Sequence, residues 1–213
     1  MPRPRLKSDD EVLDAANTVL KRCGPVNFTL NEVAAEVGLS RAALIQRFVN
    51  RDTLLIKMMA RSVAQARAYL ERLPMEAGPE GLWAFLQALV RGMGGGYDFS
   101  VNFLIAWYEL QVPELRKLAV QRNRAVLDAI ARRLPPGTQP NRATLLHAVI
   151  AGAATQWVTQ PRGSLADHVL AQVAEALRLM FPDHASFDVH PARRGPGARP
   201  AKVSRSRHTG TTR

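Results

Sequence analysis

Residues 41–47 carry side chains that suit contact with the edges of DNA bases. The guanidinium of Arg41 can donate two hydrogen bonds to guanine, and the side-chain amide of Gln46 can pair with adenine in the same way. Ala42 and Ala43 are small enough for close approach, and their methyl groups can touch the methyl group of thymine. The segment is therefore a candidate reader of DNA sequence.

A second set of polar side chains flanks this segment and suits contact with the DNA backbone. Hydroxyl, amide and guanidinium groups can all donate hydrogen bonds to phosphate oxygens. These candidates are Thr29, Asn31, Arg47, Asn50 and Arg51, and Ser40 is a further residue that we expect at the DNA interface. The backbone amides that follow Asn50 are a further candidate, because the N-terminus of a helix attracts anions.

The spacing of residues 30–48 predicts the helix-turn-helix that would position these groups. Ala34 is small where two helices would cross, and Gly38 gives the backbone freedom that a tight turn needs. Ser40 can cap the second helix, and the apolar side chains of Leu44 and Phe48 can anchor it to a core. The alternative interpretation is a cluster of three helices that only packs, and the two capping boxes and the anchor pair favour DNA binding over it.

Helical spacing of apolar residues recurs along the rest of the chain, and no strand pattern persists. Ser8–Glu11 and Thr29–Glu32 each have the pattern of a capping box, and Gly24-Pro25 should end the first helix. Beyond the third helix, the pattern predicts helices at about 50–73, 80–94, 98–110, 113–134, 141–160 and 164–181. We therefore expect an all-α fold of about nine helices, in which a three-helix domain is joined to a C-terminal bundle.

The formal net charge of +11 is spread unevenly along the 213 residues. The last 31 residues carry seven basic and two acidic side chains, with many Pro, Gly and Ser residues. Such a composition predicts a disordered basic tail, which either has no role or attracts nucleic acid weakly. The predicted organisation is a DNA-binding domain at 1–57, a ligand-binding and dimerisation domain at 58–182, and the tail at 183–213.

Several classes of function lack support in the sequence. The five histidines do not form a metal-binding pattern, and no HExxH, GxSxG or P-loop spacing is present. We expect neither an enzyme nor a metal or other cofactor. No long apolar run predicts a membrane span, and the N-terminus lacks the apolar core of a secretory signal. The single cysteine, Cys23, fits a reducing cytoplasm.

The segment from Glu11 to Leu55 resembles the DNA-binding domain of the tetracycline-repressor (TetR) family of bacterial transcription regulators. The resemblance rests on Phe28-Thr29, Val33-Ala34, Val37-Gly38-Leu39-Ser40, Leu44, Phe48 and Arg51-Asp52-Thr53-Leu54-Leu55. A weaker similarity to the C-terminal domains of one branch covers residues 107–110 and 113–116. Three positions depart from the usual family pattern: Ile45 replaces a tyrosine that contacts the DNA backbone, Arg47 a common histidine, and Arg51 the usual lysine. Isoleucine cannot form the hydrogen bond of that tyrosine.

The resemblance implies a homodimeric regulator, usually a repressor, that binds a pseudo-palindromic double-stranded DNA operator and releases it when a small-molecule effector binds the bundle. Aromatic and polar groups should line the effector cavity, although burial in an ordinary core is the competing interpretation. The candidates are Trp83, Phe103, Trp107, Tyr108 and His147. The alternative function is a helical module that sequesters a ligand or binds another protein, without a specific DNA target.

The resemblance also places the dimer surface on the helices at 141–160 and 164–181. Ala148, Gly152 and Ala153 would form a stripe of small residues on the first of them. An apolar ridge on the second would consist of Val169, Val173, Leu177 and Met180. Burial of these residues within one subunit is the alternative.

Overall fold

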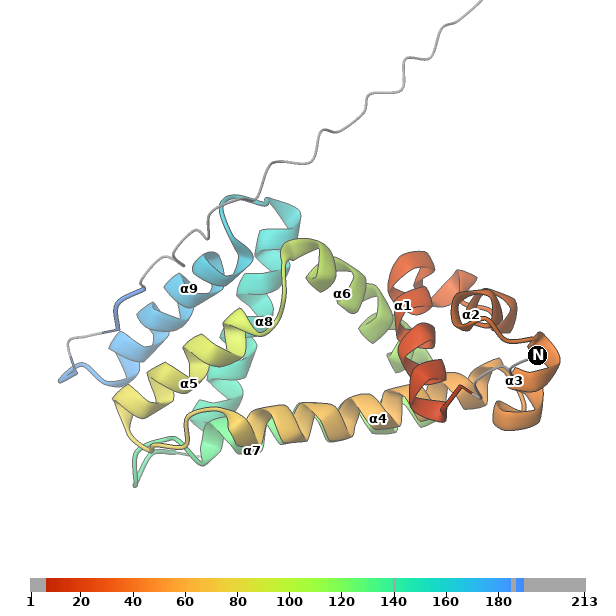
Figure 1. The fold of residues 1–213 in the computed structure, drawn as a ribbon. Helices are drawn as coiled ribbons and strands as arrows, with labels where there is room; N and C mark the ends of the chain where they lie inside the picture. Colours follow the sequence, from red (N-terminus) through yellow and green to blue (C-terminus); the bar gives the residue numbers. More distant parts are fainter. Residues whose placement is uncertain (1–6, 140, 185–186, 190–213) are drawn as a thin grey trace, which may run out of the picture.

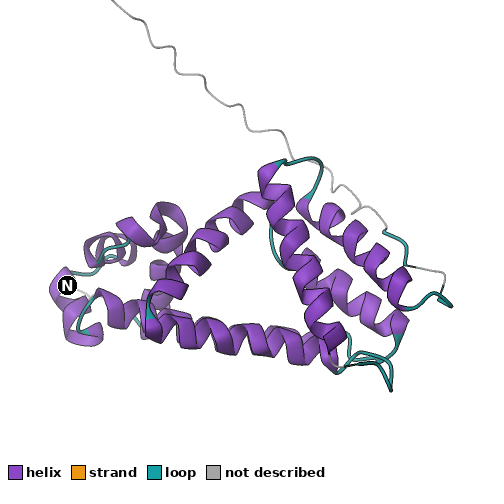
Figure 2. Ribbon diagram, turned by 180° about the vertical axis from the view of Figure 1, so that it is seen from behind, coloured by secondary structure: helices purple, strands orange, loops and turns teal. Residues whose placement is uncertain are grey.

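The computed structural model describes residues 7–139, 141–184 and 187–189, and every regular element in these residues is a helix (Figures 1 and 2). The all-α prediction and the number of helices are confirmed for this part of the chain. The helices are α1 (Asp9–Asn27), α2 (Leu30–Val37), α3 (Arg41–Phe48), α4 (Arg51–Arg72), α5 (Pro79–Arg91), α6 (Gly96–Gln111), α7 (Pro113–Ala131), α8 (Asn141–Thr159) and α9 (Leu165–Met180). None of them is long and apolar enough to cross a membrane.

Local caps explain where the first helices begin. At α1 the capping box is complete: the Ser8 hydroxyl accepts from the amide of Glu11 at 3.1 Å, and the Glu11 carboxylate accepts from the amide of Ser8 at 2.8 Å. The hydrogen bonds from the Ser8 backbone and from Lys7 lower the pKa of Glu11. At α2 only half of the predicted box forms. Thr29 caps the helix, but the carboxylate of Glu32 lies 3.5 Å from the guanidinium of Arg22 instead.

Gly24 breaks α1 where the sequence predicts an end. Its φ of 73° and ψ of 170° are not helical, and a positive φ is accessible to glycine because it has no Cβ. One further turn continues to Asn27 beyond the break. This kink brings Phe28 back onto the core, where it is 1% exposed.

Two hydrophobic cores organise the molecule, and α4 belongs to both. The first core holds the buried faces of α1–α3 and the beginning of α4, together with Ile105 of α6 and Leu115 of α7. The second gathers α5, α8 and α9 around the ends of α4 and α7, with Leu70 as the contribution of α4. Figure 1 shows α4 running along α7 from the three N-terminal helices to the bundle. A displacement of α4 would therefore alter the packing of both cores.

A buried arginine fixes the bundle end of α4. Arg133 follows α7 and is 0% exposed, and its guanidinium donates to the carbonyl oxygens of Leu70, Leu73 and Pro74 at 3.5, 3.4 and 2.5 Å. It also lies 3.8 Å from the centre of the Phe85 ring. Burial, together with the charge of neighbouring Arg132, lowers its pKa. These contacts satisfy carbonyl groups at the end of α4 that no helical amide reaches.

The predicted apolar ridge of the ninth helix lies inside the subunit. Val169, Val173 and Leu177 are each 0% exposed and pack in the second core, so the dimer-ridge prediction is wrong for these three residues. The reason is that α9 uses this face to cover α8 and α5. On the outer surface Ala148 and Gly152 of α8 are exposed, whereas Ala153 is buried.

Part of the predicted tail packs on the bundle. Phe187 is 1% exposed, and its ring meets that of Trp83 edge-on, with centroids 6.1 Å apart. Residues 185–186 and 190–213 lie outside the described residues, and the prediction for them remains a prediction.

Candidate nucleic-acid interface and ligand pocket

The turn between α2 and α3 has the geometry that the sequence predicts. Gly38 adopts the left-handed conformation with φ 72° and ψ 37°, and the amide of Leu39 bonds back to the carbonyl of Ala34 at 3.0 Å. The Ser40 hydroxyl then accepts from the amide of Ala43 at 3.1 Å and starts α3. Leu44 and Phe48 are 0% exposed. With these two anchors inside, the opposite face of α3 points to solvent.

The candidate base-reading side chains lie on this solvent face. Arg41, Ala42 and Gln46 are exposed, and Ala43 is half-buried. Arg41 has no hydrogen bond or ion pair with any residue that the structure describes. Beside it is a groove of about 370 Å³ between the starts of α2, α3 and α4. The groove is lined in part by Thr29, Asn31, Arg41, Ile45, Val49 and Asn50.

Three of the predicted DNA-binding residues also serve as helix caps. The side-chain oxygens of Thr29, Ser40 and Asn50 accept from amides of α2, α3 and α4, the last at 2.8 Å from Thr53. Capping uses only their acceptor capacity, since hydroxyl hydrogens and the Asn50 amide hydrogens are donors. Each side chain can therefore hold its helix and still donate to a phosphate.

Arg47 and Arg51, the two arginines predicted to contact phosphate, already form hydrogen bonds within the protein. Arg47 bonds to the carboxylate of Asp9 and, at 2.8 Å, to the carbonyl oxygen of Lys7. These bonds tie α3 to the start of α1. Arg47 thus lies on the side of α3 that faces the protein, and a phosphate would have to compete with Asp9 for it.

Arg51 is held more tightly still. Its guanidinium donates to the carbonyls of Phe28 at 2.8 Å and Pro25 at 2.6 Å, to Asp52 at 2.8 Å, and to the hydroxyl of Tyr108 at 3.0 Å. These bonds engage four of its five N–H donors. Burial opposes the charge, but the hydrogen bonds to Tyr108 and Asp52 outweigh it and raise the pKa of Arg51. The start of α4 is thereby joined to α1 and α6.

The structure does not gather the five predicted pocket residues around one hollow. Trp83 is 7% exposed and packs in the second core, whereas Phe103 and Trp107 are 49% and 62% exposed on α6. Tyr108 faces Arg51 in the first core, and His147 is half-buried on α8 with its pKa lowered by burial. They lie on different faces of three helices.

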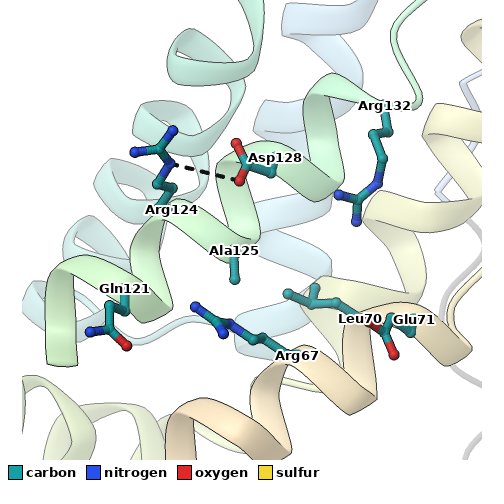
Figure 3. A pocket seen from close by; sticks show the side chains of 8 residues that line it. All are labelled: Arg67, Leu70, Glu71, Gln121, Arg124, Ala125, Asp128 and Arg132. Atoms are coloured by element: carbon teal, nitrogen blue, oxygen red, sulfur yellow. Dashed lines mark ion pairs between the residues drawn. The ribbon is translucent and has the colours of Figure 1, made fainter.

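Two hollows are present elsewhere. One, of about 290 Å³, lies between α4 and α7 (Figure 3), where Arg67 and Arg132 point inward over Leu70 and Ala125. The other, of about 520 Å³, lies where α1 meets α4, α6 and α7. Neither is lined by a predicted pocket residue. No group of histidine, cysteine and carboxylate side chains among the described residues could hold a metal ion.

Residues 12–58 match the sequence model of a family described as bacterial regulatory proteins, tetR family. No curated protein sequence matches the chain.

Solved structures share the fold at low sequence identity. A TetR-family member from Streptomyces coelicolor has a TM-score of 0.63 and 20% identity, over 78% of this chain and 96% of its own. The regulator FadR from Bacillus subtilis, solved with stearoyl-CoA, has a TM-score of 0.63 and 16% identity, over 80% of this chain and 98% of its own. The multidrug binding protein EbrR, solved with malachite green, has a TM-score of 0.64 and 21% identity, over 82% of this chain and 98% of its own.

The chain has the TetR-family fold and N-terminal domain. The resemblance of the segment from Glu11 to Leu55 to the TetR family is thereby confirmed. Within this TetR-family fold, Ile45 replaces the usual tyrosine on the wall of the groove and is 37% exposed, so an apolar surface stands where a hydrogen-bonding group was expected.

Sequence reasoning missed Val49, which lies on the same groove. It has a φ of 66° and a ψ of −60°, and the amide of Asn50 bonds to the carbonyl of Phe48 across it at 2.7 Å. This is a tight γ-turn, which is strained for a β-branched residue. Nothing in the sequence marks the position, because valine gives no turn signal.

Proposed function

We propose that this chain is a ligand-responsive, sequence-specific DNA-binding transcription regulator that acts as a repressor in the cytoplasm. The observation that carries the proposal is the outer face of α3. There Arg41, which lines a groove, and Gln46 are both exposed, on a helix whose other face is anchored by Leu44 and Phe48. A guanidinium and an amide on an exposed helix can read the major groove.

The functional unit in this proposal is a homodimer on a pseudo-palindromic operator. A helix-turn-helix reader usually needs two copies whose recognition helices are roughly 34 Å apart, one turn of DNA. The outer faces of α8 and α9 support an assembly, since Ala148 and Gly152 allow a second helix to approach closely and Leu179 is 78% exposed. Residues 1–57 would bind DNA, and residues 58–182 would dimerise and bind the effector.

The response to an effector would travel through α4 and α6. Arg51 and Tyr108 connect these helices at the DNA-binding domain, and α4 continues into the second core. Two proteins of the same fold were solved with small molecules, malachite green in EbrR and stearoyl-CoA in FadR. An effector that binds the non-reading state about 1.4 kcal/mol more tightly would weaken operator binding tenfold.

The test is fluorescence anisotropy of the purified full chain on the DNA upstream of its own gene, against a scrambled sequence of equal length, at two salt concentrations. We expect a preference for the native DNA that survives the higher salt, because base contacts are less salt-dependent than phosphate contacts. Equal binding to both DNAs that collapses with salt would overturn the proposal and favour the ligand-sequestering or protein-binding alternative.

A further inference from the structure

The hollow between the two domains is built by four helices. Asp14, Asn17 and Lys21 enter it from α1, and Asn102 and Glu109 from α6. Residues of α4 and Arg122 of α7 complete the wall. At about 520 Å³ it is within the usual size of sites for small organic molecules. It is the junction at which the DNA-binding domain rests on the bundle.

One part of the wall is apolar. Leu20, Met58, Met59 and Ile105 contribute to it, and their exposed fractions are only 0, 4, 6 and 9%. Methionine side chains adapt to different shapes, so this wall can accept an aliphatic or aromatic body. The remaining wall offers hydroxyl and amide groups from Ser62, Gln65, Asn17 and Asn102.

The charges around the hollow are mostly paired with one another. Glu109 is 1% exposed, and both of its carboxylate oxygens accept from the Arg122 guanidinium. Arg61 pairs with Asp14 and with Asp10. Lys21 remains, with no ion pair to any residue that the structure describes. Because Asp10 and Asp14 both pair with Arg61, and Glu109 pairs with Arg122, Lys21 is the charged side chain of the wall without an ionic partner among the described residues.

We propose that this interdomain hollow binds a small monoanionic carboxylate with an apolar body. The body would lie on Met58, Met59 and Ile105, and the carboxylate would meet Lys21 and the nearby amides of Asn17 and Asn102. A cationic ligand is disfavoured, because the carboxylates of Glu109 and Asp14 are already paired with arginine side chains.

Occupancy of this site would act directly on the orientation of the DNA-binding domain. A ligand between α1 and α6 touches the first core on one side and the Glu109–Arg122 pair on the other. It would favour the spacing of these helices that accommodates it, and the alternative spacing would lose population. This consequence for DNA rests on the proposed function, whereas binding of the carboxylate does not.

The test is isothermal titration calorimetry of the full chain, without DNA, against octanoate, octanamide and octylamine. We expect octanoate to bind roughly fivefold more tightly than octanamide, as expected for one charge pair near the surface, and octylamine to bind least. Lys21→Gln should abolish the advantage of octanoate over octanamide. The matched control is Lys117→Gln, an exposed lysine of α7 outside the hollow, which should leave it unchanged.

A second variant fills the hollow from its exposed rim. Asn102→Trp changes an exposed side chain, so folding should be retained, and binding of octanoate should be lost. Equal affinity for octanoate and octanamide, a preference for octylamine, or unchanged binding in both variants would overturn the assignment. Octanoate should also weaken binding to the upstream DNA. If calorimetry succeeds and no specific DNA binding is found, the proposed function fails and the carboxylate site stands.

Discussion

The outer face of α3 and the start of α4 use their arginines in opposite ways. On α3, Arg41 is exposed and has no partner among the described residues. A few residues later, Arg51 places four N–H donors on Phe28, Pro25, Asp52 and Tyr108. Both are basic residues of the N-terminal domain, and the sequence alone predicts DNA contacts for both.

The difference indicates that an arginine can contact DNA only when its N–H donors are not already used within the protein. A guanidinium whose donors are already satisfied must break internal hydrogen bonds before it can meet a phosphate, which costs free energy. Arg41 has no such cost. We therefore expect Arg41 to act on recognition and Arg51 to act on the integrity of the domain junction.

Arg51→Ala should have the largest effect, and the effect should be on stability. The variant leaves the carbonyls of Phe28 and Pro25 without their donor and removes the contacts with two aromatic rings. Hydrogen bonds to charged groups contribute about 1.5–3 kcal/mol each, and part of this is recovered from water, so we expect a loss of roughly 2–4 kcal/mol. Urea unfolding measures it. An unchanged midpoint together with a weaker salt dependence of DNA binding would make Arg51 a phosphate contact after all.

Arg41→Ala should leave stability unchanged and reduce discrimination between DNA sequences by roughly 1–3 kcal/mol. Anisotropy on native and scrambled DNA, together with the urea midpoint, measures both quantities. Arg116→Ala is the control, since Arg116 is exposed on α7 and distant in sequence from the reading helix. A uniform loss of affinity on every DNA would show that Arg41 contacts phosphate, and the comparison with Arg51 would then concern two backbone contacts.

The fold was largely predictable because its signals are local. Ser8, Ser40 and Asn50 cap helices within three residues of themselves, and Gly38 turns the chain in a left-handed conformation that glycine adopts without strain. Such interactions can be read from spacing. The exposed side chains of α3 follow from the same helical period once Leu44 and Phe48 are placed inside.

The partners of the polar residues were not predictable in this way. Arg51 meets Tyr108 across 57 positions of sequence, and Arg47 meets Asp9 across 38. Only the tertiary packing of helices that are distant in sequence brings these groups together. The ridge of Val169, Val173 and Leu177 shows the same limit, because an apolar face does not reveal whether its own subunit or a partner covers it.

Val49→Gly should stabilise the protein, and it tests whether the turn after α3 is strained. The positive φ of Val49 is strained for a β-branched residue, and its side chain is 67% exposed, so little packing is lost. Relief of about 1–2 kcal/mol of strain, less the greater flexibility of glycine in the unfolded chain, leaves a gain of roughly 1 kcal/mol. Thermal unfolding measures it, with Val49→Ala as the control that keeps the Cβ. A lower melting temperature for the glycine variant would mean that the valine side chain stabilises the turn.

Tyr108→Phe should have the smallest effect and tests whether the junction acts as a unit. The ring stays over Arg51, and only the hydroxyl that accepts from its guanidinium is lost. We expect a loss of about 0.5–1 kcal/mol, because the partly exposed guanidinium can turn to water. In the Arg51→Ala background the same substitution should cost almost nothing, and a double-mutant cycle by urea unfolding measures the coupling. Full additivity would mean that the two side chains stabilise the protein independently. Coupling instead means that α4 and α6 share an interaction at the N-terminal domain, so a change in the position of either helix reaches the other through Arg51.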